Sequence, residues 1–527
     1  MLKNFTLPED FWENIEIDGE DLDHLNSHLL EVETPLTPNA LVAELVPARI
    51  QREKETAQAN RAKAGKSYLP KDRYEVGEKL VFHAFDSALG EVTGSRAAKA
   101  GAGDPFDVIE VVFPDGHKRE FAMGLEHHRL NEPMKTDETD PLTSPDHVIS
   151  EYGSMLEDKL AAELQENEDF VYIAGRWFPK ALIVDVNIGN LNLAEAVLDM
   201  HEGGPIPTES LLKEVGLPEG VNPKLAEFSL DMALQDDKRF DEVGPAGEVA
   251  WFLRRVEPQE VLETPLFLRH EQSDYERDLL TEEMINLETL VDDELSPVEG
   301  LGEELDEIEV RLIFPHWQVG SLPLTSRMLR FFPTAYESPR IRFMLVDGQS
   351  GDKFPGWVVR LEKYVYGLKD WYRERGMMPG SYVKVRRGEN PGEVVVDFAA
   401  HRANKEWVRT ALVGADGGVV YAMLKQPVFT TFDERMMVFM PSEFETLEAR
   451  WTKGTRRPFE ETIVNTMREL AKLNPQSHVH VTELYSAVNL IRRTPPGPIM
   501  ALLNSRPWFV HVGDLHYRVE GAGEGQD

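Results

Sequence analysis

Residues 208–253 read TESLLKEVGLPEGVNPKLAEFSLDMALQDDKRFDEVGPAGEVAWFL, and this stretch decides the fold that we predict. Thr208 is a helix cap, and apolar residues at helical spacing follow it. A second helix begins with Pro223 in its first turn. Two short extended runs then flank the turn at residues 244–247, which is typical of a β-hairpin. With the apolar helix at residues 191–200 in front, three helices and a hairpin form one small domain.

The same order returns near the C-terminus. Three stretches with helical apolar spacing precede two extended runs, at residues 459–473, 482–488, 496–504, 508–512 and 515–519. In both copies an aromatic-rich hairpin directly follows the third helix. This order predicts two winged helix-turn-helix domains.

The first copy resembles the winged-helix domain of the RNA polymerase delta subunit and of its relatives in bacterial and chromatin proteins. The resemblance lies in Phe228, Leu230, the run at residues 237–240, Val243-Gly244 and Val249-Ala250-Trp251. It covers residues 191–253 of the 527 and contains no catalytic motif. It implies an interaction module or a nucleic-acid-binding module.

Two further parts of the chain have the two-residue period of strands. Residues 71–132 carry short strands and a Pro114-Asp115-Gly116 turn. They resemble the Tudor and CarD-type SH3-like barrels through Val76-Gly77, Gly90-Glu91-Val92 and Phe121-Ala122. This resemblance implies binding to a protein or to polymerase.

Residues 320–398 resemble the B3-type pseudobarrel of plant transcription factors and of some restriction-enzyme recognition domains. In both, a strand ending in an acidic-Gly turn precedes an aromatic-rich strand, a short helix and a Pro-Gly-x-x-Val strand, here at residues 340–348, 364–368, 370–375 and 379–383. Another kind of small barrel is the alternative.

The sequence therefore predicts a multidomain α+β chain with two winged helix-turn-helix domains, two small β-barrel-like domains and an N-terminal helical arm. The expected domains are an acidic arm and helix at 1–70, an SH3-like barrel at 71–132, a hairpin plus winged helix at 150–270, an acidic helix and linker at 271–308, a β-rich barrel at 309–450 and a C-terminal winged helix at 455–520.

The formal net charge of −37 argues against a chain that coats nucleic acid indiscriminately. Acidic residues are concentrated in residues 4–48 and 271–309, where 11 and 16 of them stand against none and one basic residue. Basic residues prevail in residues 321–388, by 13 to 6, and in residues 451–519, by 9 to 5. We expect basic surfaces in the second half, unless these runs are simply solvated faces.

The chain has no cysteine, which excludes disulfides and cysteine-based zinc sites. Residues 1–10 lack the features of a signal peptide, and no apolar run reaches the roughly 20 residues of a membrane helix. We therefore expect a cytoplasmic protein without a membrane partner.

Catalytic motifs were sought and not found. The sequence contains no phosphate loop followed by Lys-Ser or Lys-Thr, no H-E-x-x-H and no G-x-S-x-G. His127-His128 and the pair His478 and His480 are better explained as surface histidines than as metal ligands. Asp107 and Glu110 lack the lysine that a nuclease site requires. We predict no enzyme activity, no cofactor and no metal.

Candidate nucleic-acid-binding residues are basic side chains of the second half, namely Arg340, Arg342, Lys384, Arg386, Arg387, Arg492, Arg493, Arg506 and Arg518. Side chains two residues apart share one face of a strand. If the strands at 340–346 and 380–385 are neighbours, their basic residues form one patch suited to phosphate. Ordinary surface ion pairs are the alternative. Four nearby aromatic residues either stack on bases or fill the barrel core: Tyr364, Tyr366, Trp371 and Tyr372.

We therefore expect a non-enzymatic bacterial DNA- or RNA-polymerase-associated regulatory protein. Its C-terminal half would contact DNA, and its N-terminal half would contact RNA polymerase or another protein. The helix at residues 223–235 is mainly acidic, which favours protein contact there. One alternative is a protein scaffold with winged helices as docking units, and another is the targeting subunit of a DNA-processing or defence complex.

Overall fold

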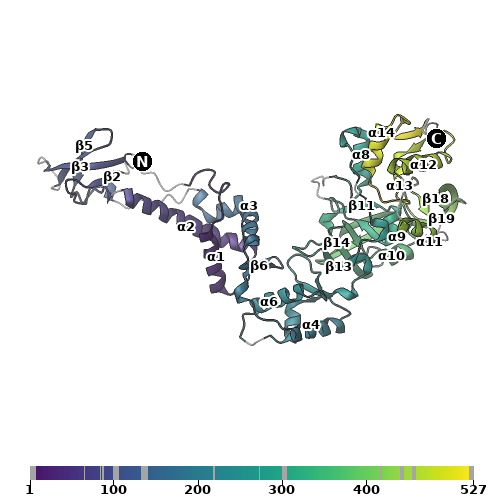
Figure 1. Cartoon of the computed structure of the whole chain (residues 1–527), viewed down its shortest axis with the longest axis horizontal. Coiled ribbons are helices and arrows are strands. Elements are labelled where there is room, and N and C mark those ends of the chain that lie inside the picture. The colour runs from purple at the N-terminus through teal and green to yellow at the C-terminus, as the bar shows by residue number, and fades with distance from the viewer. Residues whose placement is uncertain are drawn as a thin grey trace. The chain divides into compact units, whose positions relative to one another are not determined.

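The computed structural model describes residues 7–64, 66–82, 85, 88–98, 106–131, 141–217, 220–271, 273–298, 305–414, 418–439, 444–453 and 458–520. This part of the chain is mixed α+β, with helices and several separate sheets, as predicted (Figure 1). It divides into two compact units, one of Met1–Asp185 with Gly220–Ser229 and one of Val186–Glu219 with Leu230–Asp527. Part of the expected linker, residues 299–304, and residues 1–6 of the expected arm lie outside the described residues.

In the first unit, three helices precede a hairpin, and we call this arrangement module A. Its elements are α1 (Gly19–Val32), α2 (Pro38–Ala64), α3 (Pro145–Glu166), β6 (Phe170–Ile173) and β7 (Arg176–Pro179). Between α1 and α2, Leu36 pairs antiparallel with Trp177 of β7, and the two residues exchange backbone hydrogen bonds of 3.2 and 2.8 Å. The order across the sheet is therefore Leu36, β7, β6.

Module B has the same order of elements. It consists of α4 (Ile188–Met200), β8 (Ile206–Pro207), α5 (Thr208–Val215), α6 (Pro223–Asp236), β9 (Phe240–Glu242) and β10 (Ala250–Leu253). Its sheet order is β8-β10-β9. The predicted helices and hairpin are confirmed. The predicted cap is wrong, because Pro207 precedes α5 and the Thr208 hydroxyl instead donates to the buried carboxylate of Asp231.

Module C repeats this order at the C-terminus, again with the predicted helices and hairpin. It consists of α12 (Phe459–Ala471), β21 (Val479–His480), α13 (Val481–Val488), α14 (Pro496–Ser505), β22 (Phe509–Gly513) and β23 (His516–Val519). Its sheet order, β21-β23-β22, matches that of module B.

The three modules agree residue by residue where the sheet is paired. One apolar residue before the second helix pairs with a buried aromatic residue of the last strand, as Leu36 with Trp177, Ile206 with Trp251 and Val479 with Tyr517. A buried phenylalanine begins the first strand of each hairpin, at Phe170, Phe240 and Phe509. Buried aliphatic residues lie ten and six positions before it on the third helix, at Leu160 and Leu164, Leu230 and Leu234, and Ile499 and Leu503. One packing pattern therefore builds all three cores.

Module A carries an insertion between α2 and α3. A five-stranded sheet of order β1-β2-β3-β4-β5 is formed by β1 (Lys66–Ser67), β2 (Lys79–Phe82), β3 (Ala88–Ala97), β4 (Asp107–Val112) and β5 (Lys118–Met123). The predicted strands are confirmed. The N–H groups of Gly124 and Leu125 donate to the carbonyls of Asp72 and Pro70, which brings the end of β5 back beside the start of the sheet.

The second unit contains a seven-stranded sheet of order β11-β16-β17-β13-β14-β15-β12. Its strands are β11 (Glu307–Arg311), β12 (Ser321–Pro323), β13 (Arg340–Asp347), β14 (Lys353–Val359), β15 (Tyr364–Tyr366), β16 (Tyr382–Arg387) and β17 (Glu393–Phe398). Two short helices, α9 (Phe314–Val319) and α10 (Lys369–Glu374), join them. Ile341, Phe343 and Leu345 alternate into its core with Val383 and Val385, among other residues.

A long hairpin follows the seven-stranded sheet. It pairs β18 (Ala400–Val413) with β19 (Val419–Thr430), and the short β20 (Val438–Phe439) lies beside β18. Helix α11 (Phe444–Lys453) leads to module C. The expected barrel at 309–450 is therefore two separate sheets, divided at Phe398 and Ala400.

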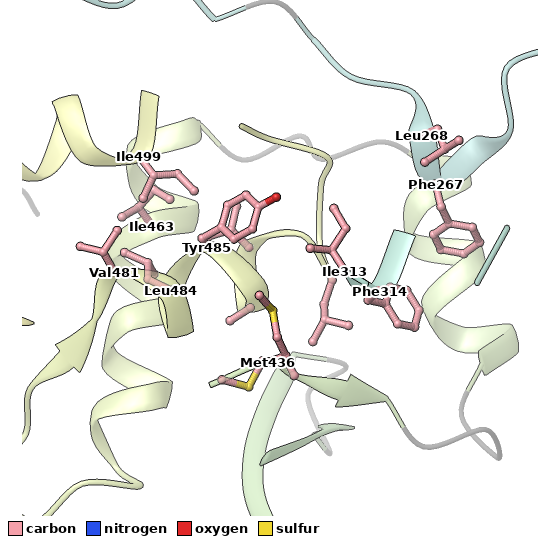
Figure 2. Close-up of a cluster of buried hydrophobic side chains, with 14 of the residues drawn as sticks. Phe267, Leu268, Ile313, Phe314, Met436, Ile463, Val481, Leu484, Tyr485 and Ile499 are labelled. Atoms are coloured by element: carbon pink, nitrogen blue, oxygen red, sulfur yellow. The ribbon is translucent and has the colours of Figure 1, made fainter. Parts of the chain in front are cut away.

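The largest apolar cluster lies in the second unit. Figure 2 shows Tyr485 between Ile313 and the side chains of module C, which include Ile463, Leu484 and Ile499. Helices α7 (Gln259–Leu262) and α8 (Glu282–Val291) contribute Val261, Met284 and Leu287 to the same cluster. Module C and the segment before the seven-stranded sheet therefore share one core.

One expected boundary is wrong. The hairpin β6–β7 pairs with Leu36 and belongs to module A, so residues 150–270 do not form one domain. The N-terminal arm is helical over α1, and Trp12 before it is buried. Trp12 contacts another segment of the same chain, since its indole N–H donates to the carbonyl of Leu142 at 2.9 Å.

The shared core pattern predicts the effect of a truncation on α6. Leu230→Ala should lower the free energy of unfolding by about 2–5 kcal/mol, because Leu230 is fully buried in the core of module B. Leu193→Ala, an exposed leucine of the same module, is the control and should change it by less than about 0.5 kcal/mol. Urea denaturation of the full chain measures both, and equal effects would contradict the assigned core.

Candidate nucleic-acid interface

The two predicted basic residues on β13, Arg340 and Arg342, contact other segments of the same chain. Arg340 Nη2 donates to Asp241, and its Nε lies 3.1 Å from the buried carboxylate of Glu257. Arg342 Nη1 donates to the carbonyl of Gly204 at 2.6 Å, and its guanidinium lies 4.9 Å from the centre of the Phe252 ring. The pair shares one face of the strand, as predicted, but that face holds the sheet against module B.

Burial has opposite effects on the pKa values of the charged groups at this contact. It lowers the pKa of the Arg342 guanidinium, which the charge of Glu202 partly offsets. It raises the pKa of Glu257 to about 8, and the charge of Asp241 adds to this while Arg340 opposes it. Arg340 therefore balances a buried acidic pair and is not free to bind phosphate.

The basic residues on β16 lie apart from those on β13. Strand β17 separates the two strands, so the expected single patch of four basic residues is wrong. Lys384 Nζ donates to Glu307 at 2.8 Å, and Arg387 donates to the carbonyl of Arg330. Among the described residues, Arg386 is exposed and makes no ion pair, although Glu307 is its neighbour on β11.

Arg493 is the most deeply buried of the predicted residues. Its guanidinium donates to Asp293 at 2.7 and 2.8 Å and to Glu294 at 2.7 Å. Burial alone would raise the pKa of Glu294, but Arg493 and His316 together hold it well below its usual range. Arg493 therefore fixes the acidic segment after α8 and belongs to the core.

The other three arginines of module C that we predicted to bind nucleic acid make ion pairs with carboxylates. Arg492 lies 2.9 Å from Glu271, Arg506 lies 3.0 Å from Glu460, and Arg518 pairs with Glu520. Exposed pairs of this kind contribute little to stability. The alternative of ordinary surface ion pairs thus describes Arg506 and Arg518.

The third helix of module C is covered by its own chain. The amide of Asn504 donates to the carbonyl of Leu279 at 2.9 Å. A Cβ atom on Gly497 would lie 2.3 Å from the Tyr275 hydroxyl. Winged helices that read DNA place this helix in the major groove. The surface on which we expected DNA contact is therefore occupied by residues 275–279.

The third helices of modules A and B are covered as well. On α3, Lys159 Nζ donates to the carbonyls of Glu13 and Ile15 at 2.7 and 2.9 Å. In the first half of α6, Phe228 packs edge-on against Phe178 of β7, with 5.8 Å between ring centres. The Val184 N–H donates to the Ser229 hydroxyl at 3.0 Å. All three third helices therefore contact protein segments of the same chain.

Three of the four predicted aromatic residues are core residues. Tyr364, Trp371 and Tyr372 are buried, and Tyr366 is half-buried. The Trp371 indole N–H donates to Asp347 at 2.9 Å, and the Tyr372 hydroxyl donates to the carbonyl of Ser321 at 2.9 Å. Trp371 and Tyr372 lie in the core of the seven-stranded sheet, and Tyr364 lies in the large cluster that the sheet shares with module C. These three residues are therefore not available for base stacking.

The hairpin β18–β19 carries a surface that our sequence analysis missed. Trp407 is 58% exposed and pairs across the strands with Lys425, whose ammonium lies 5.2 Å from the indole ring. Lys405 lies two residues before Trp407 and is exposed on the same face. The alternation Lys405-x-Trp407 was the available signal, but it lies beyond the B3-like resemblance, which ends at residue 398.

Acidic side chains and histidines were also candidates for a metal site. Within the residues that the structure describes, no three His, Asp or Glu side chains converge to hold a metal ion. A cavity of about 150 Å³ is lined by Asp292, Glu294, Arg360 and Lys363, among others. Its carboxylates already have partners, since Asp292 accepts from Thr325 and Glu294 accepts from Arg493. These acids hold the structure together at this cavity.

Comparisons with protein-family models, with curated proteins and with solved structures gave no match to this chain. In the part of the chain that the structure describes, no helix has the length and apolar character needed to span a membrane.

The buried position of Arg493 predicts a large loss of stability on its removal. Arg493→Met should lower the free energy of unfolding by about 3–5 kcal/mol, because it removes the charged partner of the buried Asp293 and leaves Glu294 with only His316 beside it. Arg506→Met, at a half-exposed pair of module C, is the matched control and should cost about 1 kcal/mol or less. Urea denaturation measures the free energy of unfolding of both variants. An Arg493→Met variant as stable as wild type would contradict the stabilising role of these buried ion pairs.

The expectation that His480 is a surface histidine is wrong, because its side chain is buried. This buried histidine makes the stability of module C sensitive to acid. Its Nδ1 accepts from the Thr482 N–H at 3.0 Å and caps α13. Burial lowers its pKa to about 3, and the charges of Arg435 and His516 add to this. Because the folded pKa lies below the unfolded value, the stability that neutral His480 supplies is complete above about pH 6.5 and is lost as the pH falls toward 3.

His480→Asn should keep the cap and remove this titration. Thermal denaturation should show wild type and variant running parallel above about pH 7 and diverging below about pH 6.5, by at most about 1.4 kcal/mol per pH unit. His511→Asn, an exposed histidine of the same sheet, should follow wild type throughout. Parallel curves for His480→Asn and wild type down to pH 4 would contradict the assignment.

Proposed function

We propose that modules A, B and C are winged helices and that this chain is a non-enzymatic, polymerase-associated regulatory protein in which they act as protein-docking units. The repeated order of helices and strands, with the same residue pairing in each sheet, supports the winged-helix assignment. The observation that carries the docking role is the cover over each third helix. A helix held by protein segments has the environment of a docking element and not that of a groove reader.

The barrels belong to the same proposal. The nearly closed sheet of residues 66–123 would be the SH3-like barrel, and the seven-stranded sheet with its two short helices would be the B3-like domain. The resemblance of module B to the polymerase delta subunit supports RNA polymerase as the partner. A cytoplasmic setting is part of the proposal and agrees with a chain that contains no cysteine.

Helix α4 of module B supplies the docking surface. Its inner face packs Leu191, Ala194 and Leu198 into the core, whereas Leu193 and Met200 point outward, the latter 81% exposed. Exposed apolar side chains along one helix face are typical of a protein contact. Because the chain carries a net charge of −37, we expect an apolar partner surface with a basic rim.

Binding of the full-length protein to purified RNA polymerase of its native cell tests this proposal. The double variant Leu193→Glu/Met200→Glu should weaken binding at least about tenfold, because central apolar contacts dominate most interfaces. Leu361→Glu is the matched control, since Leu361 is 80% exposed in the turn between β14 and β15. It should bind as wild type does.

Absence of any binding by wild type would overturn the association with polymerase. Equal binding by the α4 variant and wild type would overturn α4 as the docking surface. Recovery of nuclease subunits instead of polymerase from the native cell would contradict this proposal and favour a targeting subunit of a DNA-processing complex.

A further inference from the structure

The exposed face of the hairpin β18–β19 combines positive charge with bare aromatic surface. Along β18, residues 400–411 carry Arg402, Lys405 and Arg409 against one acidic residue, Glu406. The chain as a whole has a net charge of −37, so this is a local reversal of sign. Among the described residues, neither Arg402 nor Lys405 makes an ion pair, whereas Arg409 pairs with Glu483. Five of the predicted arginines are also in ion pairs, namely Arg340, Arg492, Arg493, Arg506 and Arg518.

The two faces of the hairpin differ in burial. Val408 and Val428 point to one side, where they are buried with Val438. Side chains alternate along a strand, so Lys405 and Trp407 point to the other side. Their cross-strand neighbours there are Pro427 and Lys425. Folding explains the first face. On the second face, Ala411 and Tyr421 are buried in the largest apolar cluster and Arg409 pairs with Glu483. The part of the second face near Lys405, Trp407 and Lys425 stays exposed.

A second aromatic side chain extends this face. Phe429 is exposed and lies four residues beyond Lys425 on β19, hence on the same side of the strand. The distance along the strand is about 13 Å, at roughly 3.3 Å per residue. Two aromatic rings therefore flank the lysine pair of residues 405 and 425 along one extended surface.

We propose that this face, with Lys405, Trp407, Lys425 and Phe429, binds single-stranded nucleic acid. Exposed aromatic rings stack on bases, and flanking lysines and arginines neutralise the phosphates. In the free protein Lys425 lies over the Trp407 ring, where a cation is attracted to the indole face. A stacked base takes that place, and the flexible lysine then reaches a phosphate.

The composition of the face favours a single strand over other partners. A duplex hides the flat faces of its bases in its stack, so Trp407 would have no stacking partner there. The face is formed by two paired strands and not by a recognition helix. The inference is independent of docking through α4, because α4 and β18 carry separate sets of residues.

Fluorescence anisotropy with the full-length protein tests the proposal. The probe is a labelled oligothymidylate of about 20 nucleotides at about 50 mM salt, compared with a duplex of the same length. Wild type should bind the single strand more tightly than the duplex. Trp407→Ala should weaken binding at least about fivefold, and Trp407→Phe should lie between the two, because a phenyl ring still stacks.

The charge contribution is tested separately. Lys405→Glu/Lys425→Glu should abolish binding at about 150 mM salt and reduce the salt dependence measured below that. The control is Tyr336→Ala combined with Lys363→Glu, an aromatic and basic pair outside the hairpin whose tyrosine is 54% exposed. It should bind as wild type does. Circular dichroism of each variant verifies the fold.

Three results would overturn the proposal. The first is no binding of oligothymidylate by wild type at about 50 mM salt, and the second is equal binding by Trp407→Ala and wild type. The third is displacement of the oligonucleotide by an equal charge of polyglutamate, which would show a general anion surface. Failure of polymerase binding through α4 would leave all three outcomes unchanged, so the two proposals fail separately.

Discussion

The pairing of one apolar residue with one aromatic residue across a short sheet is the contact on which the three modules depend. In module B, Ile206 and Trp251 pair, and the indole N–H of Trp251 also donates to Asp231 on α6 at 2.9 Å. The hairpin is thereby tied to the strand before the second helix and to the third helix at once. Leu230 and Leu234 fill the space beneath the tryptophan. The same pairing in modules A and C explains how very different sequences reach one arrangement.

Modules B and C could be predicted because their elements follow one another without interruption. Module A could not, for two physical reasons. Its first strand is the single residue Leu36, which has no strand pattern of its own, and its second and third helices are separated by the barrel of residues 66–123. Only the pairing of Leu36 with Trp177 reveals that elements so distant in sequence form one unit.

The candidate site was less predictable than the fold. Strand alternation correctly placed Arg340 and Arg342 on one face, but it could not show that Asp241, about a hundred positions earlier, lies opposite. Arg493 likewise meets Asp293 and Glu294 from a distant acidic run. Clusters of like charge in sequence therefore became pairs of opposite charge in space. The shared face of Lys405 and Trp407 could have been predicted from the sequence, since residues two apart on a strand point to the same side.

The acidic character of the chain has a structural use in this arrangement. The runs at residues 4–48 and 271–309 supply segments that lie on α3 and α14, where a DNA-reading winged helix would expose its surface to phosphate. Glu271, Asp293 and Glu294 also engage Arg492 and Arg493 at the entrance to α14. Acidic side chains therefore neutralise the two arginines before α14 within the chain itself. On the β18–β19 face, by contrast, the basic side chains of Lys405 and Lys425 are exposed.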